Sequence, residues 1–271
     1  MIKHYLKVAF RNLMKYKTQS LVSIIGLAVG FTCFALSALW IRYEMTYDNF
    51  HEGADRIYLV RAHYANEPGT SKFTPYPLMK YLQDKMPEIE AVTAFTAHHV
   101  KFRMEDTEQE IGMIAADSVF MNFFDIQLLK GTVNFLKCDG QEVAITKEFA
   151  KRLFSKEEDA LGKEVEVGRR VCKIGAIVSG WSNHSNIPYN ILAPARHSPR
   201  WGSSNEQLFI RVRERTDIDV FRTKMSTIRI NDIEKESELS DLLITRMSAL
   251  RYSDYVDKAD VVISFSYIFY F

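Results

Sequence analysis

Histidine and serine side chains are the first candidates for chemistry in this sequence, and their spacing argues against it. His98 and His99 are adjacent, so on a strand they point to opposite faces and cannot easily bind one metal ion. His184 lies between Ser182 and Ser185, but no G-x-S-x-G turn is present to expose a nucleophilic serine. We therefore expect no metal site, and the second group is predicted to be a polar turn.

Nucleotide chemistry needs a glycine-rich phosphate loop, and this sequence lacks one. Gly162 and Lys163 are followed by Glu164 instead of Ser or Thr, and no glycine lies five positions before Gly162, so the P-loop pattern is incomplete. The acidic run at 105–110 is predicted to be a solvated hairpin edge. We expect no catalytic residue, no metal ligand and no cofactor, so any ATP hydrolysis must come from another chain.

Charge is unevenly distributed along the chain. Residues 1–43 contain six Lys or Arg and no acidic residue, whereas all 34 acidic residues lie beyond this head. No strongly basic region exists elsewhere, which excludes nucleic acid as a partner. The cations of the head instead flank an apolar segment.

That apolar segment predicts a transmembrane helix. Ser20–Ile41 contains 22 uncharged residues, which as a helix would reach roughly 33 Å, enough to cross the hydrocarbon core. A cleaved signal peptide is the alternative, but its apolar region is shorter and ends in small residues rather than in Trp40 and Tyr43. We expect an uncleaved transmembrane helix over 19–43.

The flanking charges predict the orientation of this helix. Lysines and arginines precede it and acidic residues follow it, and the positively charged flank remains in the cytoplasm. We therefore expect a protein of the cell inner membrane, with a cytoplasmic N-terminus and a periplasmic main domain.

The head, residues 1–18, has the pattern of an amphipathic helix. Apolar side chains recur at steps of three and one up to Phe10, Leu13 and Met14, and the cations lie off this stripe. Such a helix lies along the cytoplasmic surface, with its apolar face on membrane lipids and its cations toward anionic headgroups. A simple continuation of the transmembrane helix is the alternative.

Small residues mark one face of the predicted transmembrane helix. Gly26 and Gly30 form a GxxxG pattern, and Ser23 lies one turn earlier on nearly the same face. Small side chains at this spacing let a second helix approach closely. The pattern also occurs by chance in membrane helices, so helix packing is one of two open interpretations.

The region beyond the helix has a mixed pattern that predicts an α+β domain. Its helices are short and its elements do not alternate as in a doubly wound sheet. Ser118 is predicted to cap the second helix, and Thr216 or Asp217 the fourth. We expect helices over 77–86, 119–124, 147–154 and 217–228. We expect strands over 57–65, 90–95, 100–104, 109–115, 142–145, 164–167, 171–178, 207–212 and 239–247.

Two features of the chain leave alternatives open. Cys138 and Cys172 can form a disulfide only if their Cα atoms come within about 7 Å; otherwise both are buried thiols. The apolar run after Asp260 is too short to cross a bilayer. It is predicted to be the start of a second span in a truncated chain, and a buried terminal strand or helix is the alternative.

Five stretches, in the expected order, resemble MacB/FtsX-like ABC transporter permeases. The first resembles the family's elbow helix and first span, and the second resembles the motif that follows the membrane. The stretches are FRNLMKYKTQSLVSIIGLAVG at 10–30, YDNFHEGADRIYLV at 47–60, and the segments 77–95, 117–132 and 142–165.

The resemblance implies a domain organisation and a set of partners. It implies a MacB-like periplasmic core domain over 44–258, in which 44–92 and 206–258 form a membrane-near subdomain and 93–205 an inserted one. Residues 259–271 would begin a second span; the family's third and fourth spans are missing. The implied partners are an ABC ATPase subunit, a second permease subunit in a homo- or heterodimer, and other envelope proteins.

The resemblance also implies roles for individual residues. Phe10, Leu13 and Met14 would contact the membrane or the ATPase. The post-membrane motif would hold the outer domain to the end of the helix, although local capping and core packing would explain the same residues. That motif comprises Tyr47, Asp48, Phe50, His51, Arg56 and Tyr58.

The implied function is that of a permease subunit, or a fragment of one. It would couple cytoplasmic ATP hydrolysis by a separate subunit to conformational change in the periplasm, for export or mechanotransmission. The alternatives are the extracytoplasmic sensor half of a membrane signalling protein and a membrane-tethered binding domain without a transport role.

Overall fold

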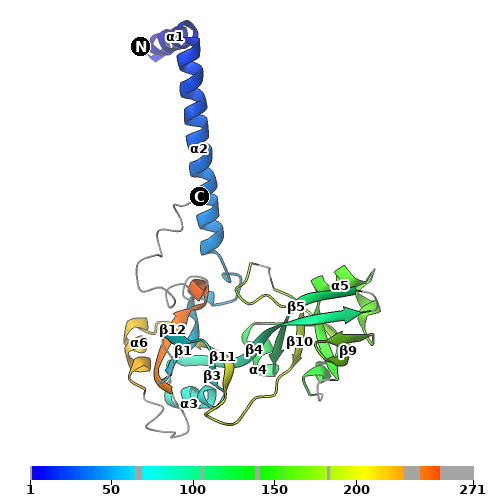
Figure 1. The fold of residues 1–271 in the computed structure, drawn as a ribbon. Coiled ribbons are helices and arrows are strands. Elements are labelled where there is room, and N and C mark those ends of the chain that lie inside the picture. Colours follow the sequence, from blue (N-terminus) through cyan, green and yellow to red (C-terminus); the bar gives the residue numbers. More distant parts are fainter. Residues whose placement is uncertain are drawn as a thin grey trace. The chain divides into compact units, whose positions relative to one another are not determined.

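The computed structural model describes residues 2–64, 69–104, 107–137, 141–154, 156–181, 184–228 and 239–250. It divides into two compact units, Met1–Tyr47 and Asp48–Phe271, which are described separately (Figure 1). The apolar run after Asp260 and Cys138 lie outside the described residues, so the predictions made for them stay predictions.

The first unit consists of two helices, α1 (Ile2–Lys15) and α2 (Lys17–Met45). Tyr16 separates them, because its φ of −110° and ψ of 56° lie outside the helical region. Figure 1 shows α1 turned away from the axis of α2. The break comes earlier than expected, since the amphipathic helix predicted over 1–18 ends at Lys15.

Helix α2 contains the whole apolar segment. It runs for 29 residues, and within the described part of the chain it is the one helix long and apolar enough to cross a membrane. None of its apolar window is buried inside the protein. A helix that is apolar all round needs a nonaqueous environment or a partner to cover it.

The second unit is built on a sheet that has 12 strands within the described residues, in the order β12-β1-β11-β4-β5-β10-β7-β9-β6 along its main path. Neighbouring strands are antiparallel, except that β10 pairs with β5 and β7 with β9 in parallel. The long strands are β1 (Ile57–Tyr64), β4 (Ile89–Met104), β5 (Thr107–Ala116), β7 (Glu142–Thr146), β9 (Arg170–Val178), β11 (Ser204–Val212) and β12 (Leu239–Arg246). The short ones are β2 (Thr70–Ser71), β3 (Thr74–Pro75), β6 (Leu128–Gly131), β8 (Glu164–Val167) and β10 (Ile191–Pro194).

Strand β4 corrects one expectation. The strands predicted over 90–95 and 100–104 are a single strand of 16 residues. Its first half pairs with β11, ending at Phe95 opposite Gln207. Its second half pairs with β5, beginning at Thr96 opposite Ala115. The sheet therefore continues across the predicted boundary at 92/93, and the division into two subdomains stays a prediction.

Helices cover both faces of β1 and its neighbours. Ile57 and Leu59 of β1 point into one core, while Tyr58 and Val60 point into another, as the two-residue period of a strand requires. The second core is closed by α3 (Pro77–Lys85) and α6 (Ile218–Ser226), and the first by α4 (Ser118–Phe123). A third core forms between β7, β9 and α5 (Lys147–Leu153).

The mixture of helices and strands confirms the predicted α+β class. Short 3-10 helices complete the described part of the chain. They are η1 (Ala54–Arg56), η2 (Val133–Leu136), η3 (Glu157–Ala160) and η5 (Met247–Ala249).

The helix caps settle one prediction and correct another. The Asp217 carboxylate accepts hydrogen bonds from the backbone N–H groups of Asp219 and Val220, so Asp217 rather than Thr216 caps α6. The prediction that Ser118 caps α4 is wrong. The preceding aspartate, Asp117, accepts the hydrogen bond from Phe120 N at 3.0 Å, and a carboxylate there also suits the positive end of the helix dipole.

Candidate functional site

Asp48 joins the start of the second unit to a distant loop. It is completely buried and has a φ of 58°, a left-handed conformation that Asp tolerates better than most residues. Its N–H donates to His184 O at 3.1 Å. Its carboxylate accepts from Asn186 N at 3.1 Å and from Asn186 Nδ2 at 2.6 Å. Burial raises the pKa of the Asp48 carboxyl, and the hydrogen bonds from Ser185 and Asn186 only partly offset this.

His51 lies in an aromatic cluster three residues further on. Its ring centroid is 4.2 Å from that of Phe50, 5.0 Å from Phe124 and 4.8 Å from Trp181. Burial, assisted by the positive charge of Arg211, lowers the pKa of His51 to about 4. The imidazole is therefore neutral at pH 7. Its buried Nε2 has no hydrogen-bond partner among the described residues.

Arg56 and Tyr58 serve other parts of the domain. Arg56 Nη1 donates to Glu90 Oε2 at 2.6 Å and to Val212 O at 3.1 Å, which ties η1 to the adjoining ends of β4 and β11. Tyr58 is buried in the core beneath α3 and α6. Asp48, Phe50 and His51 thus lie close to one another in the turn that begins the second unit. Arg56 and Tyr58 contact other elements. Tyr47 is the last residue of the first unit.

A pocket opens beside the aromatic cluster. Its volume is about 410 Å³, and aromatic side chains from three separate segments line it: Phe50 and His51, Phe124, and Trp181 with Tyr189. Glu52 and Asp125 also line it. Two hydrogen bonds shape the wall, from Trp181 Nε1 to Ile187 O and from Tyr189 Oη to Ser179 O, both 2.9 Å long. Sequence analysis missed this site, although the aromatics of the loop 181–190 were a usable signal.

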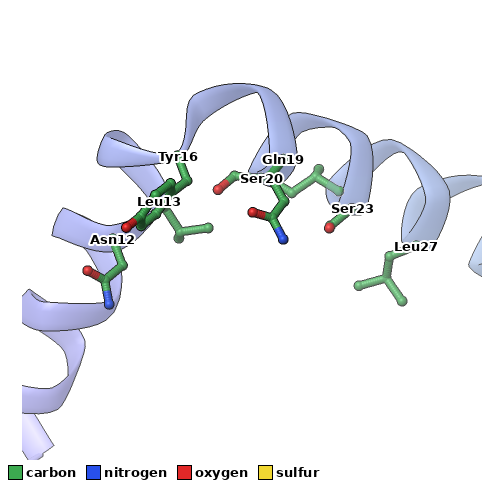
Figure 2. A pocket seen from close by; sticks show the side chains of 8 residues that line it. Asn12, Leu13, Tyr16, Gln19, Ser20, Ser23 and Leu27 are labelled. Atoms are coloured by element: carbon green, nitrogen blue, oxygen red, sulfur yellow. The ribbon is translucent and has the colours of Figure 1, made fainter.

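A second pocket of about 550 Å³ lies on the inner side of the bend between α1 and α2 (Figure 2). Leu13 from the predicted elbow set and Ser23 from the predicted packing set both line it. Phe10 and Met14 are exposed and lie outside its lining. The remaining lining residues are Asn12, Tyr16, Gln19, Ser20, Ile24 and Leu27.

Gly26 and Gly30 are open on α2. A Cβ built on either glycine would meet no described atom within 4 Å. The face that they form with Ser23 therefore has room for an approaching helix, and its role in packing remains a prediction.

His197 occupies a charged site that the sequence analysis did not find. Its Nδ1 is 3.2 Å from Glu206 Oε1 and its Nε2 is 3.7 Å from Asp117 Oδ2. Its ring stacks on Tyr76 with centroids 4.0 Å apart. Burial alone would lower the pKa of His197, but the two carboxylates outweigh it and raise the pKa to about 9. Burial likewise acts to raise the pKa of Asp117, and His197 reverses this so that the pKa lies below its usual value.

The histidine pair of the sequence lies on the second half of β4. His98 and His99 are both exposed and stand opposite Met113 and Gly112 of β5. Over the ranges that the structure describes, no three His, Cys, Asp or Glu side chains are arranged to hold a metal ion. Within the described residues, the candidate functional features are the two pockets and the buried polar contacts.

The apolar helix α2 and the α+β domain that follows it agree with a family of membrane proteins that have an extracytoplasmic domain. The family model of the MacB-like periplasmic core domain matches residues 20–228, and the chain belongs to this family. The resemblance drawn from the five sequence stretches is thereby confirmed. This family is a component of transporter permeases and not a class of enzymes.

Three solved structures share the fold. A permease-protein domain from Porphyromonas gingivalis has 19% identity and a TM-score of 0.59, covering 72% of this chain and 92% of that chain. The periplasmic region of MacB from Actinobacillus actinomycetemcomitans has 12% identity and a TM-score of 0.51, covering 75% and 94%. The extracellular domain of the ABC-type transporter YknZ from Gram-positive bacteria has 14% identity and a TM-score of 0.50, covering 70% and 99%. No curated protein matches the sequence.

Proposed function

We propose that the chain is a permease subunit, or part of one, of a MacB/FtsX-type ABC transporter. A separate ATPase subunit hydrolyses ATP in the cytoplasm, and the permease transmits the resulting movement to its extracytoplasmic domain. The protein acts as a homo- or heterodimer in the cell inner membrane, with α1 on the cytoplasmic side.

One observation carries this proposal: a cationic amphipathic helix leads directly into a long apolar helix in a chain of the MacB-like family. Helix α1 has its exposed apolar side chains at Phe10, Leu13 and Met14, where they can contact lipid or the ATPase. Helix α2 continues without interruption for 29 residues, so a displacement at its first turn reaches its last. ATP binding that favours one of two arrangements of the subunits would then change the position of the outer domains.

The site residues have matching roles in this proposal. Ser23, Gly26 and Gly30 meet a helix of the second permease subunit. Asp48 holds the start of the outer domain against the loop 184–187, and His51 packs it against Phe124 and Trp181. The start of the domain would then move together with these segments. The relatives named as transporters support a transport role for the domain.

Distance measurements between the two permease subunits test the proposal. The full chain, with its native cysteines replaced, carries a spin label at Val171→Cys or Val220→Cys, both positions being well exposed. In lipid nanodiscs with the ATPase subunit, the interspin distance should differ between the nucleotide-free and ATP-bound states. Phe10→Glu, which interrupts the apolar stripe of α1, should reduce this difference, whereas Val133→Glu, the same kind of change at an exposed apolar residue of η2, should preserve it.

Two outcomes count against the proposal. Interspin distances that stay constant at both positions, in a sample whose ATPase is active, exclude transmission to the outer domain. Failure of an ABC ATPase subunit to co-purify with the chain favours the sensor or the tethered binding domain instead.

A further inference from the structure

His51 lines the pocket beside the aromatic cluster and is itself almost completely buried. His51 is 8% exposed, and its Nε2 is buried without a hydrogen-bond partner in the part of the chain that the structure describes. A buried polar atom without a partner costs free energy, so native structures almost always satisfy it. Burial lowers the pKa of His51 to about 4, so its imidazole is neutral at pH 7 and adds no positive charge to the pocket.

Aromatic side chains from three segments of the chain line the pocket. Phe50, Phe124, Trp181 and Tyr189 supply aromatic rings, whose faces attract cations. Their rings lie close together, with Phe124 and Trp181 5.1 Å apart and Trp181 and Tyr189 4.7 Å apart. Aromatic side chains that converge in this way form the sites that recognise ammonium groups in other proteins.

Two carboxylates at the pocket have no cation of their own. Glu52 and Asp125 both line it and are exposed, and neither forms an ion pair with a residue in the described ranges. Asp125 also has a φ of 53°, a left-handed conformation that is uncommon for a residue with a side chain. An anionic ligand would be repelled here, whereas a cation would gain from both carboxylates.

The nearby arginine does not fill this role. Arg211 Nη2 donates to Phe123 O at 2.5 Å, and its guanidinium lies 5.0 Å from the centre of the Phe123 ring. It is not among the residues that line the pocket. Its guanidinium therefore lies outside the pocket lining, although its positive charge still acts on His51.

We propose that this pocket binds a primary alkylammonium group, presented either by a small free amine or by a lysine side chain of a peptide. The ammonium lies against the aromatic rings within reach of Glu52 and Asp125, and its apolar stem contacts Ile126, which also lines the pocket. Binding is independent of the proposed coupling to an ATPase, so either proposal can fail without the other.

Fluorescence of Trp181 measures this binding in the full chain. Trp40→Phe and Trp201→Phe leave Trp181 as the only tryptophan of the chain. Pentylammonium probes a free amine, and Nα-acetyl-lysine methylamide probes a lysine side chain in a peptide. Each is compared with a neutral analogue of the same shape, pentanol or the Nε-acetylated lysine derivative. We expect each charged probe to cause a saturable change in Trp181 fluorescence, with a Kd on the order of 1 mM. The neutral analogue should bind at least tenfold more weakly.

Matched carboxylate variants locate the binding. The double variant Glu52→Gln with Asp125→Asn should weaken binding of the charged probe at least tenfold and leave binding of the neutral analogue unchanged. Asp84→Asn, an exposed carboxylate on α3 outside the pocket, should have no effect. Equal binding of charged and neutral probes, no binding of either charged probe at about 10 mM, or equal weakening by Asp84→Asn would each overturn the proposal.

Discussion

At the scale of single residues, the second unit depends on polar side chains that are buried with their partners. Asp48 and His197 each connect segments that are more than 70 residues apart in the sequence. Sequence analysis singled out Asp48 through the post-membrane motif. It could not find the His197 site, because Asp117, His197 and Glu206 form no local pattern and meet only after folding.

His197 should make the stability of the domain depend on pH. Its pKa rises from an ordinary 6.5 to about 9 in the folded state, so its contribution is complete below pH 6.5 and is lost as pH rises toward 9. His197→Gln should therefore cost about 2 kcal/mol at pH 6, after allowance for solvent screening, and little above the folded pKa. Denaturant unfolding at both pH values measures this.

His99→Gln provides the control, because His99 is exposed on β4 and should have no effect at either pH. A loss of stability in His197→Gln that is the same at both pH values would show that packing on Tyr76, and not charge, explains the role of His197.

The stability of the domain should fall when Asp48 loses its acceptor oxygens. Asp48→Ala leaves Asn186 N without its partner and places alanine in a left-handed conformation, so unfolding should become easier by about 2–4 kcal/mol. Asp48→Asn keeps one acceptor oxygen and a residue that tolerates this conformation, and should cost about half as much. Equal stability of the two variants in denaturant titrations would contradict the assigned hydrogen bonds.

At the scale of elements, most predictions followed from local chemistry. Strands β1, β5 and β9 were predicted because they alternate or are rich in branched residues, and α3 because proline begins it. Strand β4 was divided in two because residues 96–99 lack a strand-like pattern. Their pairing with β5 extends the strand regardless, and such tertiary contacts override local propensity. The four-residue strands β6 and β10 were missed because they too depend on tertiary pairing rather than on local propensity.

The cap of α6 offers a test at this scale. Asp217→Ala removes two hydrogen bonds to backbone N–H groups and should lower the stability of the domain by about 1 kcal/mol. Thr216→Ala, at the position that the sequence left as an alternative, should change it by less than half as much. The two variants are compared by denaturant unfolding of the full chain, and a larger loss for Thr216→Ala would reverse the assignment of the cap.

At the scale of the whole molecule, the chain combines a membrane helix with a MacB-like domain. The family, the α+β class and the apolar helix were all predictable, since each depends on long stretches of sequence. The pocket beside His51 was not, because its wall comes from segments that only the folded chain brings together. The orientation in the membrane depends on the charge asymmetry and stays a prediction.

Cysteine labelling tests that orientation. In a chain whose native cysteines are replaced, Val171→Cys lies on an exposed position of the second unit and Arg11→Cys on the cationic face of α1. A membrane-impermeant maleimide added to intact spheroplasts should label the first and should label the second only after lysis. Labelling in the opposite order would invert the topology and remove the basis for coupling to a cytoplasmic ATPase.

The continuity of β4 has a consequence for how the outer domain deforms. A strand of 16 residues extends about 50 Å, and its backbone is common to the pairing with β11 and the pairing with β5. A rotation of one half of the sheet against the other must therefore twist this strand or break ladder hydrogen bonds beside Phe95 and Thr96. Amide protons at these two residues are the ones whose exchange with solvent would report such a rotation.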